Sequence, residues 1–191
     1  MGGGDSGDEA LMLRYAGGDA AAFDDLYARH RGGLYRYLLR QLGNNRALAE
    51  ELFQEIWMNL IGARSRYRVE AKFTTWLYTM AHNRVVDHYR RHRNMALVTL
   101  DDGDDDDPPD EVPAPGTAQP ERIVEARQQA ARLLALIEGL PLVQREAFLL
   151  HEEAGLSVDE IASVIGVDRE AIKSRLRYAL DKLRGGMGDA L

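Results

Sequence analysis

The feature that most limits the fold of this 191-residue chain is an acidic, proline-rich stretch near its middle. Residues 99–120 read TLDDGDDDDPPDEVPAPGTAQP and hold five of the six prolines together with eight acidic side chains. Such a segment buries too little apolar surface to offset the entropy lost on ordering. We therefore predict a disordered linker at 96–120, between an N-terminal domain at 1–95 and a C-terminal domain at 121–191.

Both flanking domains show helical periodicity, with apolar residues at spacings of three and four. Because no stretch has a convincing β-hairpin pattern, we predict an all-α fold of two small helical domains. In the N-terminal domain we expect a short helix from Leu11, then helices at 20–42 behind an Asp19 N-cap, at 47–63 and at about 72–92. In the C-terminal domain we expect helices at about 121–138, 142–153, 158–165 and 168–184.

Charge is spread unevenly along the chain. The formal net charge is −7, yet residues 64–93 hold eight Arg or Lys against two acidic residues, and residues 169–184 hold six against two. A net charge describes the field around a protein only when its charges are evenly distributed. We therefore predict two basic surfaces separated by an anionic strip.

Several classes of protein are excluded by what the sequence lacks. The chain has no cysteine, which rules out disulfides, thiolate metal sites and cysteine nucleophiles. No apolar run approaches the roughly 18 residues of a membrane span, and the start MGGGDSGDEA does not resemble a secretory signal. There is no nucleophile elbow, glycine-rich phosphate loop or HExxH helix. We expect a cytoplasmic protein without membrane insertion, enzymatic activity or cofactor.

Residues 156–183, LSVDEIASVIGVDREAIKSRLRYALDKL, have the layout of a helix-turn-helix motif. Ser157 and Glu160 form a capping box, Gly166 permits the tight turn, and Asp168 caps the second helix. The second helix has an apolar stripe made of Ile172, Leu176, Leu180 and Leu183.

The face of this second helix turned away from the stripe is basic. It has the position from which a recognition helix enters the major groove, and it carries Arg169, Glu170, Lys173, Ser174 and Arg177. Arg175 and Tyr178 lie to the flank and are better placed for phosphates. The alternative is a helical hairpin whose basic face is only solvated.

The other basic stretch, residues 64–93, combines arginines with aromatic rings. Bases released from a duplex are held by stacking on rings and by hydrogen bonds to their edges. Tyr67 and Phe73 would supply the stacking, and Asn83 has the donor and acceptor needed to read an edge. We expect Trp76 in the core and Asp87 paired with Arg90 or Arg91.

Histidine is frequent in the same stretch. His88 and His92 stand one helical turn apart, as two metal ligands can. The arginines around them disfavour a further cation, so we expect contact with phosphate or solvent and no metal site.

Four stretches carry a resemblance to a known family. In chain order they are GDAAAFDDLYARH, ALAEELFQEIW, FTTWLYTMAHNRVVDHYRR and GLPLVQREAFLLHEEAGLSVDEIASVIGVDREAIKSRLRYALDKLR. The chain resembles the extracytoplasmic-function (ECF) sigma factors, the small two-domain class of bacterial RNA polymerase specificity subunits. A helix-turn-helix alone would be shared with many regulators, but the four stretches in this order are specific to that family.

The resemblance implies two contacts with core RNA polymerase. The helix at 47–63 would hold the β′ clamp helices through Leu48, Glu50, Glu51, Gln54, Glu55 and Trp57. The C-terminal domain would sit on the β flap.

The resemblance also implies two contacts with promoter DNA. The N-terminal domain would melt the minus-10 element and capture a flipped base at Tyr67 and Asn83. The other residues expected to contact minus-10 DNA are Lys72, Phe73, Arg84, Asp87, His88, Arg90 and Arg91. The C-terminal domain would read the minus-35 element through Arg169, Lys173, Ser174, Arg175, Arg177 and Tyr178.

Regulation and rival functions remain open at this level. Family members are commonly held by an anti-sigma factor, and we expect such a partner. The acidic linker is either a solvated spacer or a DNA-mimicking strip that shields a basic surface. A stand-alone helix-turn-helix regulator would explain the C-terminal domain but would leave the helix at 47–63 and the aromatic-basic stretch without a purpose.

Overall fold

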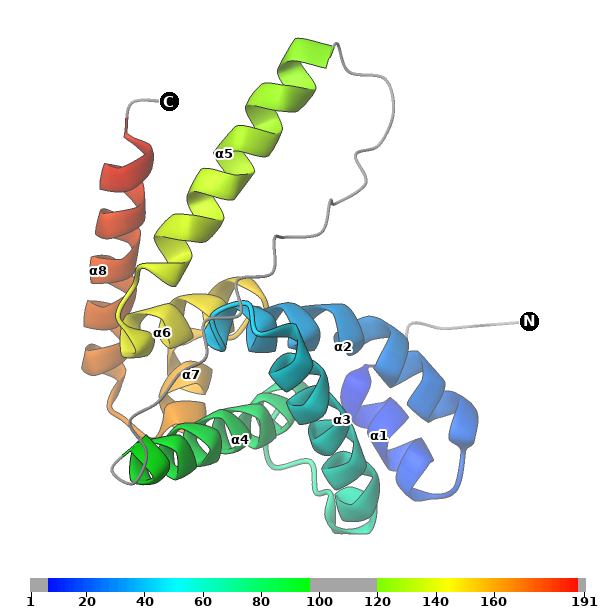
Figure 1. Ribbon diagram of the computed structural model, residues 1–191. Helices are drawn as coiled ribbons and strands as arrows, with labels where there is room; N and C mark the ends of the chain where they lie inside the picture. Colours follow the sequence, from blue (N-terminus) through cyan, green and yellow to red (C-terminus); the bar gives the residue numbers. More distant parts are fainter. Residues whose placement is uncertain (1–6, 97–119, 189–191) are drawn as a thin grey trace.

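The structure is a computed structural model, and it describes residues 7–96 and 120–188 (Figure 1). Within these ranges the chain forms helices and no strand, so the all-α prediction is confirmed. Almost all of the predicted linker at 96–120 lies outside the described residues. None of the helices in the described ranges has the length and apolar character needed to cross a lipid bilayer.

The N-terminal half contains four α-helices and one short 3₁₀ turn, Arg64–Arg66. Asp19 caps α2 by accepting hydrogen bonds from the backbone N–H groups of Ala21 and Ala22. After α2, Gly43 and Asn44 adopt positive φ angles of 63° and 60°, which ends the helix. The helices are α1 (Asp8–Ala16), α2 (Ala20–Gln41), α3 (Arg46–Ala63) and α4 (Phe73–Ala96).

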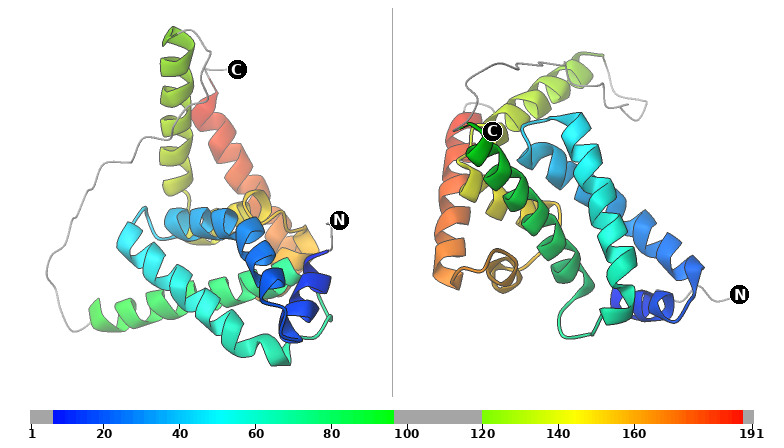
Figure 2. Two further views of the ribbon diagram at one scale, coloured as in Figure 1. Left: turned by 90° about the vertical axis from the view of Figure 1, so that its right-hand side faces the viewer. Right: turned by 60° about the horizontal axis from the view of Figure 1, so that its bottom comes forward.

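The C-terminal half contains the remaining helices: α5 (Pro120–Glu138), α6 (Leu142–Glu152), α7 (Val158–Ile165) and α8 (Arg169–Met187). The capping box is present, because Ser157 Oγ accepts from Glu160 N–H at 3.3 Å and Glu160 accepts from Ser157 N–H at 2.8 Å. Gly166 follows α7 with φ 77°, and Asp168 accepts from Ala171 N–H at 2.8 Å. The predicted helix-turn-helix is therefore formed by α7 and α8. Figure 2 shows that α5 and α8 project from the rest of the helices.

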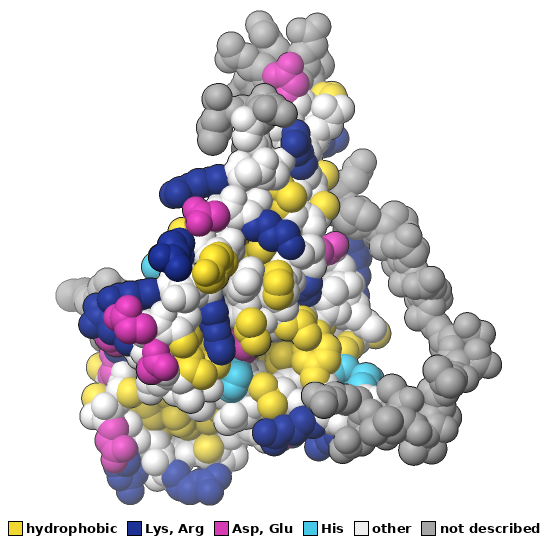
Figure 3. Space-filling view, turned by 90° about the vertical axis from the view of Figure 1, so that its left-hand side faces the viewer, with side chains coloured by type: hydrophobic (Ala, Val, Ile, Leu, Met, Phe, Trp, Pro, Cys, Tyr) yellow, Lys and Arg dark blue, Asp and Glu magenta, His cyan; other side chains and the backbone are white. Residues whose placement is uncertain are grey.

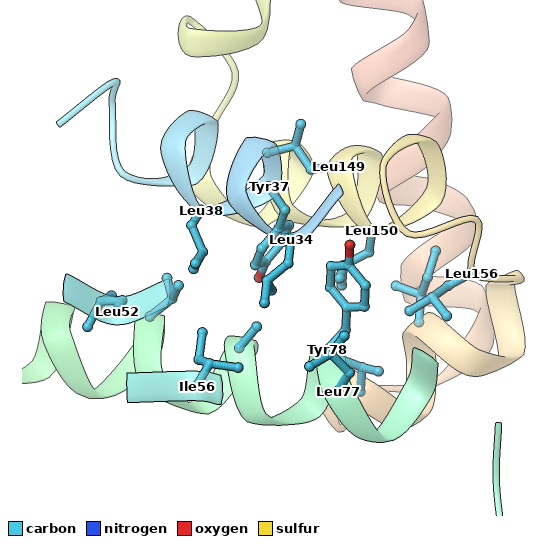
Figure 4. Close-up of a cluster of buried hydrophobic side chains, with 14 of the residues drawn as sticks. Leu34, Tyr37, Leu38, Leu52, Ile56, Leu77, Tyr78, Leu149, Leu150 and Leu156 are labelled. Atoms are coloured by element: carbon cyan, nitrogen blue, oxygen red, sulfur yellow. The ribbon is translucent and has the colours of Figure 1, made fainter. Parts of the chain in front are cut away.

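The hydrophobic core continues from one half of the chain into the other. Figure 4 shows Leu34, Tyr37 and Tyr78 beside Leu149, Leu150 and Leu156, and all of these side chains are buried. Helix α6 packs on α2, and α7 packs on α4. Sequence periodicity indicates that a face is buried but does not identify its partner, so this packing of the two halves was not predicted.

Candidate nucleic-acid interface

Helix α8 presents its predicted DNA face to solvent, while Ile172 and Leu176 hold its other side in the core. Arg169, Lys173, Arg177 and Tyr178 are exposed, and Ser174 and Arg175 are half-buried. Two of its cations have local acidic partners. Arg169 pairs with Asp159 at 3.2 Å, and Lys173 pairs with Glu170 at 2.8 Å. Lys and Arg side chains are spread over the side of the molecule that carries α8, with acidic side chains between them (Figure 3).

Most of the residues of α4 that are predicted to bind DNA are also at least partly exposed to solvent. Its buried side consists of Leu77, Tyr78, Ala81 and Val85. Asn83, Arg90 and Arg91 are exposed, while Arg84, Asp87 and His88 are half-buried. The amide of Asn83 is thus on the surface of α4, the helix that also carries Arg84, Arg90 and Arg91.

Two aromatic residues predicted to stack on bases are buried instead. Tyr67 is 4% exposed and Phe73 is fully buried. Both rings lie near the partly buried Trp76, at centroid distances of 5.0 Å and 6.2 Å, and Phe73 N–H donates to Glu9 Oε1 at 2.8 Å. Burial raises the pKa of Tyr67, and the nearby carboxylates Glu9 and Asp8 raise it further. The two rings predicted to stack on bases therefore lie in the core of the described chain, Phe73 at the start of α4 and Tyr67 in the segment before it.

Lys72, also in the predicted DNA set, is exposed and pairs with Glu160 of α7 at 2.9 Å. The hydrogen bond and charge of Glu160 raise the pKa of Lys72. This lysine of the predicted DNA set is therefore engaged by the helix-turn-helix of the other half.

The face of α3 that is predicted to bind polymerase is partly exposed to solvent. Glu50, Glu51 and Gln54 are exposed, and Leu48 and Glu55 are half-buried. Trp57, the remaining member of the predicted polymerase set, is only 5% exposed and packs against Phe23, Tyr27 and Phe53. Trp57 is at the margin of the apolar stripe of α3, where spacing alone does not decide exposure.

The neighbouring Met58, outside the predicted polymerase set, is 66% exposed. It follows Glu51 and Gln54 at the spacing of one helix face.

Members of the predicted polymerase set and of the predicted minus-10 DNA set line one cleft between α3 and α4. Its volume is about 260 Å³, and it is bounded by Leu48, Glu51, Leu52, Glu55, Arg84, Asp87, His88, Arg91 and His92. Burial lowers the pKa of His88, and His92, whose ring centroid is 4.0 Å away, lowers it further. In the described part of the chain, no group of three His, Asp or Glu side chains is placed to hold a metal ion.

Each half of the chain matches a known protein family. The Sigma-70 region 2 family matches residues 26–95, and the Sigma-70 region 4 family matches residues 130–183. The RNA polymerase sigma factor CarQ of Myxococcus xanthus is 31% identical over 179 residues, covering 93% of this chain and 96% of CarQ. The ECF RNA polymerase sigma factor SigK of Mycobacterium tuberculosis H37Rv is 30% identical over 181 residues, covering 92% of this chain and 91% of SigK.

Solved structures share the fold. CnrH in complex with the cytosolic domain of CnrY has a TM-score of 0.66 and 23% identity, with 96% of this chain and 99% of CnrH covered. The sigma factor RpoE of Bartonella quintana, in complex with the anti-sigma factor NepR, has a TM-score of 0.69 and 19% identity, with 88% and 98% covered. From the family matches and the near full-length relatives, this chain belongs to the extracytoplasmic-function family of RNA polymerase sigma factors, which recognise promoters.

Proposed function

We propose that this chain opens the minus-10 element on α4 while α3 holds the polymerase. The observation that carries the proposal is the shared cleft, in which Glu55 of α3 and Arg84 of α4 lie 3.7 Å apart. A polymerase contact that engages Glu55 would release Arg84 toward a DNA phosphate. Binding of polymerase and binding of the separated strand would then support each other.

Strand opening would be driven by capture of a base from the non-template strand. Asn83 would read the edge of that base, and Arg90 and Arg91 would hold the backbone phosphates. Each stacked base returns about 1–3 kcal/mol, comparable with the few kcal/mol needed to unstack and unpair one position. Tyr67 and Phe73 are buried, so a base could stack on either ring only after that ring left the core. Trp76 is only partly buried and is therefore the more accessible candidate for stacking.

The C-terminal half would read the minus-35 element with α8 in the major groove. Arg169, Lys173 and Arg177 face outward from the first half of that helix, which is the part that reaches base edges. Ser174, Arg175 and Tyr178 would support this reading from the flank, chiefly through phosphates.

Three further elements complete the proposal. Core polymerase would bind through its β′ clamp helices on Leu48, Glu50, Glu51, Gln54, Glu55 and Met58, and through its β flap on the C-terminal half. An anti-sigma factor would hold the free chain, as the CnrY domain and NepR accompany the similar folds. The chain itself would perform no covalent chemistry and would act in the cytoplasm, where the polymerase is.

The test is the Asn83→Ala variant assayed with purified core polymerase. Polymerase assembly and binding to duplex DNA should persist, while permanganate reactivity of the minus-10 bases and run-off RNA should be lost. Gln129→Ala on α5 is the matched control, because it removes an exposed amide far along the chain from α4. Normal opening by Asn83→Ala would contradict base capture, and tight promoter binding without polymerase would favour the stand-alone regulator.

A further inference from the structure

Helix α4 begins without a capping side chain of its own. Helices α2, α3, α7 and α8 are each preceded by a residue whose side chain accepts a hydrogen bond from a backbone N–H of the first turn. The residue before α4 is Lys72, whose ammonium group has donors and no acceptor, and Ala71 precedes it. The backbone N–H groups in the first turn of α4 therefore need an acceptor from elsewhere.

One such acceptor comes from α1. Glu9, in the first turn of α1, accepts a hydrogen bond from Phe73 N–H, with 2.8 Å between Glu9 Oε1 and the nitrogen. Phe73 is the first residue of α4, and its ring is fully buried. The helix that carries Asn83 is thus capped by a side chain that lies 64 positions before Phe73 in the chain.

Helix α1 also contacts the other end of the segment that joins α3 to α4. The guanidinium carbon of Arg64 lies 5.5 Å from the centroid of the Tyr15 ring, which is within the range of a cation–π contact. Helix α1 packs on both the 3₁₀ turn Arg64–Arg66 and α4. A single helix therefore contacts the segment 64–72 where it begins and where it ends.

The start of α1 is anchored on α2. Asp8 Oδ1 accepts a hydrogen bond from Arg29 Nη1 at 3.0 Å, and Asp8 Oδ2 lies 2.7 Å from His30 Nε2. Leu11 and Met12 of α1 are buried in the core. These contacts give α1 a fixed position relative to the other N-terminal helices.

The segment and the first turn of α4 carry three aromatic rings that pack together. The Trp76 ring centroid is 5.0 Å from that of Tyr67 and 6.2 Å from that of Phe73, and Trp76 is the only partly buried ring of the three. Trp76 N–H donates to the carbonyl of Lys72 at 3.2 Å, so the first turn of α4 sets its position. Tyr67 OH is buried and has no hydrogen-bond partner among the residues that the structure describes. Packing, and not a side-chain hydrogen bond, therefore holds the Tyr67 ring.

We propose that Glu9 is a positioning residue for base capture at the minus-10 element. By capping α4 at Phe73, it keeps the first turn of that helix formed and holds Trp76 where a released base stacks. Glu9 acts through the helix and not on the DNA. The inference rests on the proposed function, because it concerns the ring on which the base would stack. It gives α1, which lies before the residues matched by the Sigma-70 region 2 family, a part in promoter opening.

The cap is tested first, in the full-length free protein. Hydrogen exchange of the Phe73 amide, followed by NMR, should be about two- to thirtyfold faster in Glu9→Ala than in the native chain, the range expected when an N-cap acceptor is lost. Glu9→Gln keeps an acceptor oxygen on a side chain of the same length and should exchange at close to the native rate. Equal rates in Glu9→Ala and the native chain would overturn the proposal.

The consequence for opening is tested with purified core polymerase on two templates. One is a duplex promoter, and the other has the same sequence with mismatches that leave the minus-10 element already unpaired. In Glu9→Ala, RNA from the duplex should fall several-fold and RNA from the unpaired template should change much less, because the cost of unpairing has been removed. Glu9→Gln should restore RNA from the duplex. An equal loss on both templates would show a general structural defect and would overturn the positioning role.

Asp24→Ala is the matched control for the change in charge. It removes one exposed carboxylate from α2 and alters the net charge by the same amount as either Glu9 variant, so it should leave both RNA yields unchanged. Circular dichroism checks that every variant keeps its helices. If Glu9→Ala folds poorly, Glu9→Asp replaces it, because this variant keeps the charge on a side chain that is one methylene shorter. Native exchange of the Phe73 amide together with native opening in Glu9→Asp would count against the cap.

Two further results separate this inference from the proposed function. If exchange of the Phe73 amide responds as expected while Glu9→Ala opens the duplex normally, Glu9 caps α4 but has no positioning role, and the inference fails. If Asn83→Ala opens the duplex normally, base capture fails as a function, while the cap measured in the free chain stands.

Discussion

Glu55 on α3 and Arg84 on α4 face each other across a cleft, with 3.7 Å between Glu55 Oε2 and Arg84 Nε. Glu55 belongs to the predicted polymerase face and Arg84 to the predicted DNA face. The pair places the two faces edge to edge on adjacent helices. A change at either residue is therefore expected to affect both binding events.

Arg84→Ala should reduce open-complex formation far more than it reduces stability. Both side chains are partly exposed, and such pairs contribute about 0.2–1 kcal/mol. Urea unfolding of Arg84→Ala, Glu55→Gln and the double variant gives the coupling energy, and permanganate footprinting with core polymerase gives the opening. A stability loss well above 1 kcal/mol would show that Arg84 has a structural role instead.

Trp57 and Met58 should behave in opposite ways although they are neighbours. Trp57→Ala removes a buried ring from an aromatic cluster and should destabilise the protein by about 3–5 kcal/mol. Met58→Ala removes an exposed side chain and should change stability by less than about 0.5 kcal/mol. Chemical denaturation tests both values. In a pull-down with core polymerase, Met58→Ala should bind more weakly, and unchanged binding would remove Met58 from the proposed face.

His88 should titrate below its ordinary pKa of 6.5, because burial and the nearby His92 disfavour its charged form. The unfolded chain then takes up the proton first, so this residue lowers stability as pH falls through 6.5 toward the lower pKa of the folded state. Proton NMR titration of the imidazole should show the shift. His92→Gln should raise the pKa of His88, and a His88 pKa at or above 6.5 in the unaltered protein would contradict the arrangement.

Ser157→Ala should weaken the helix-turn-helix by removing the side chain that caps α7. The expected cost is about 0.5–2 kcal/mol, as for other N-cap serines. Ser163→Ala is the control, because this exposed serine lies within the same helix. Thermal unfolding should separate the two variants, and equal melting temperatures would mean that the cap contributes nothing.

The local structure could be predicted from sequence because local interactions determine it. Asp19, Ser157 and Asp168 cap their helices through backbone groups two or three residues away, and Gly166 ends α7 through its own φ angle. The outward face of α8 followed from the same reasoning, since its apolar stripe fixes the rotation of the helix. These features need no knowledge of the rest of the fold.

The burial of Tyr67, Phe73 and Trp57 was decided only by tertiary packing. The first two pack against Trp76 of α4, with the His30 ring of α2 also beside Phe73, and Trp57 is surrounded by rings from α2 and α3. Nothing within a few residues of these positions specifies those neighbours. The position of a residue in the sequence is therefore weaker evidence that it contacts a partner than the exposure of its side chain in the folded chain.

The amino-acid sequence by itself determined the helices, their caps, the helix-turn-helix and the location of the basic faces, because hydrophobic period and capping act over one or two turns. The tertiary structure alone decided that α6 and α7 pack on α2 and α4, and that Glu146, Glu153 and Glu160 meet Tyr37, His82, Arg36, Arg40 and Lys72. An apolar stripe specifies that a face is buried but not which other face covers it. That choice depends on shape and charge complementarity between residues as much as 117 positions apart, as between Arg36 and Glu153.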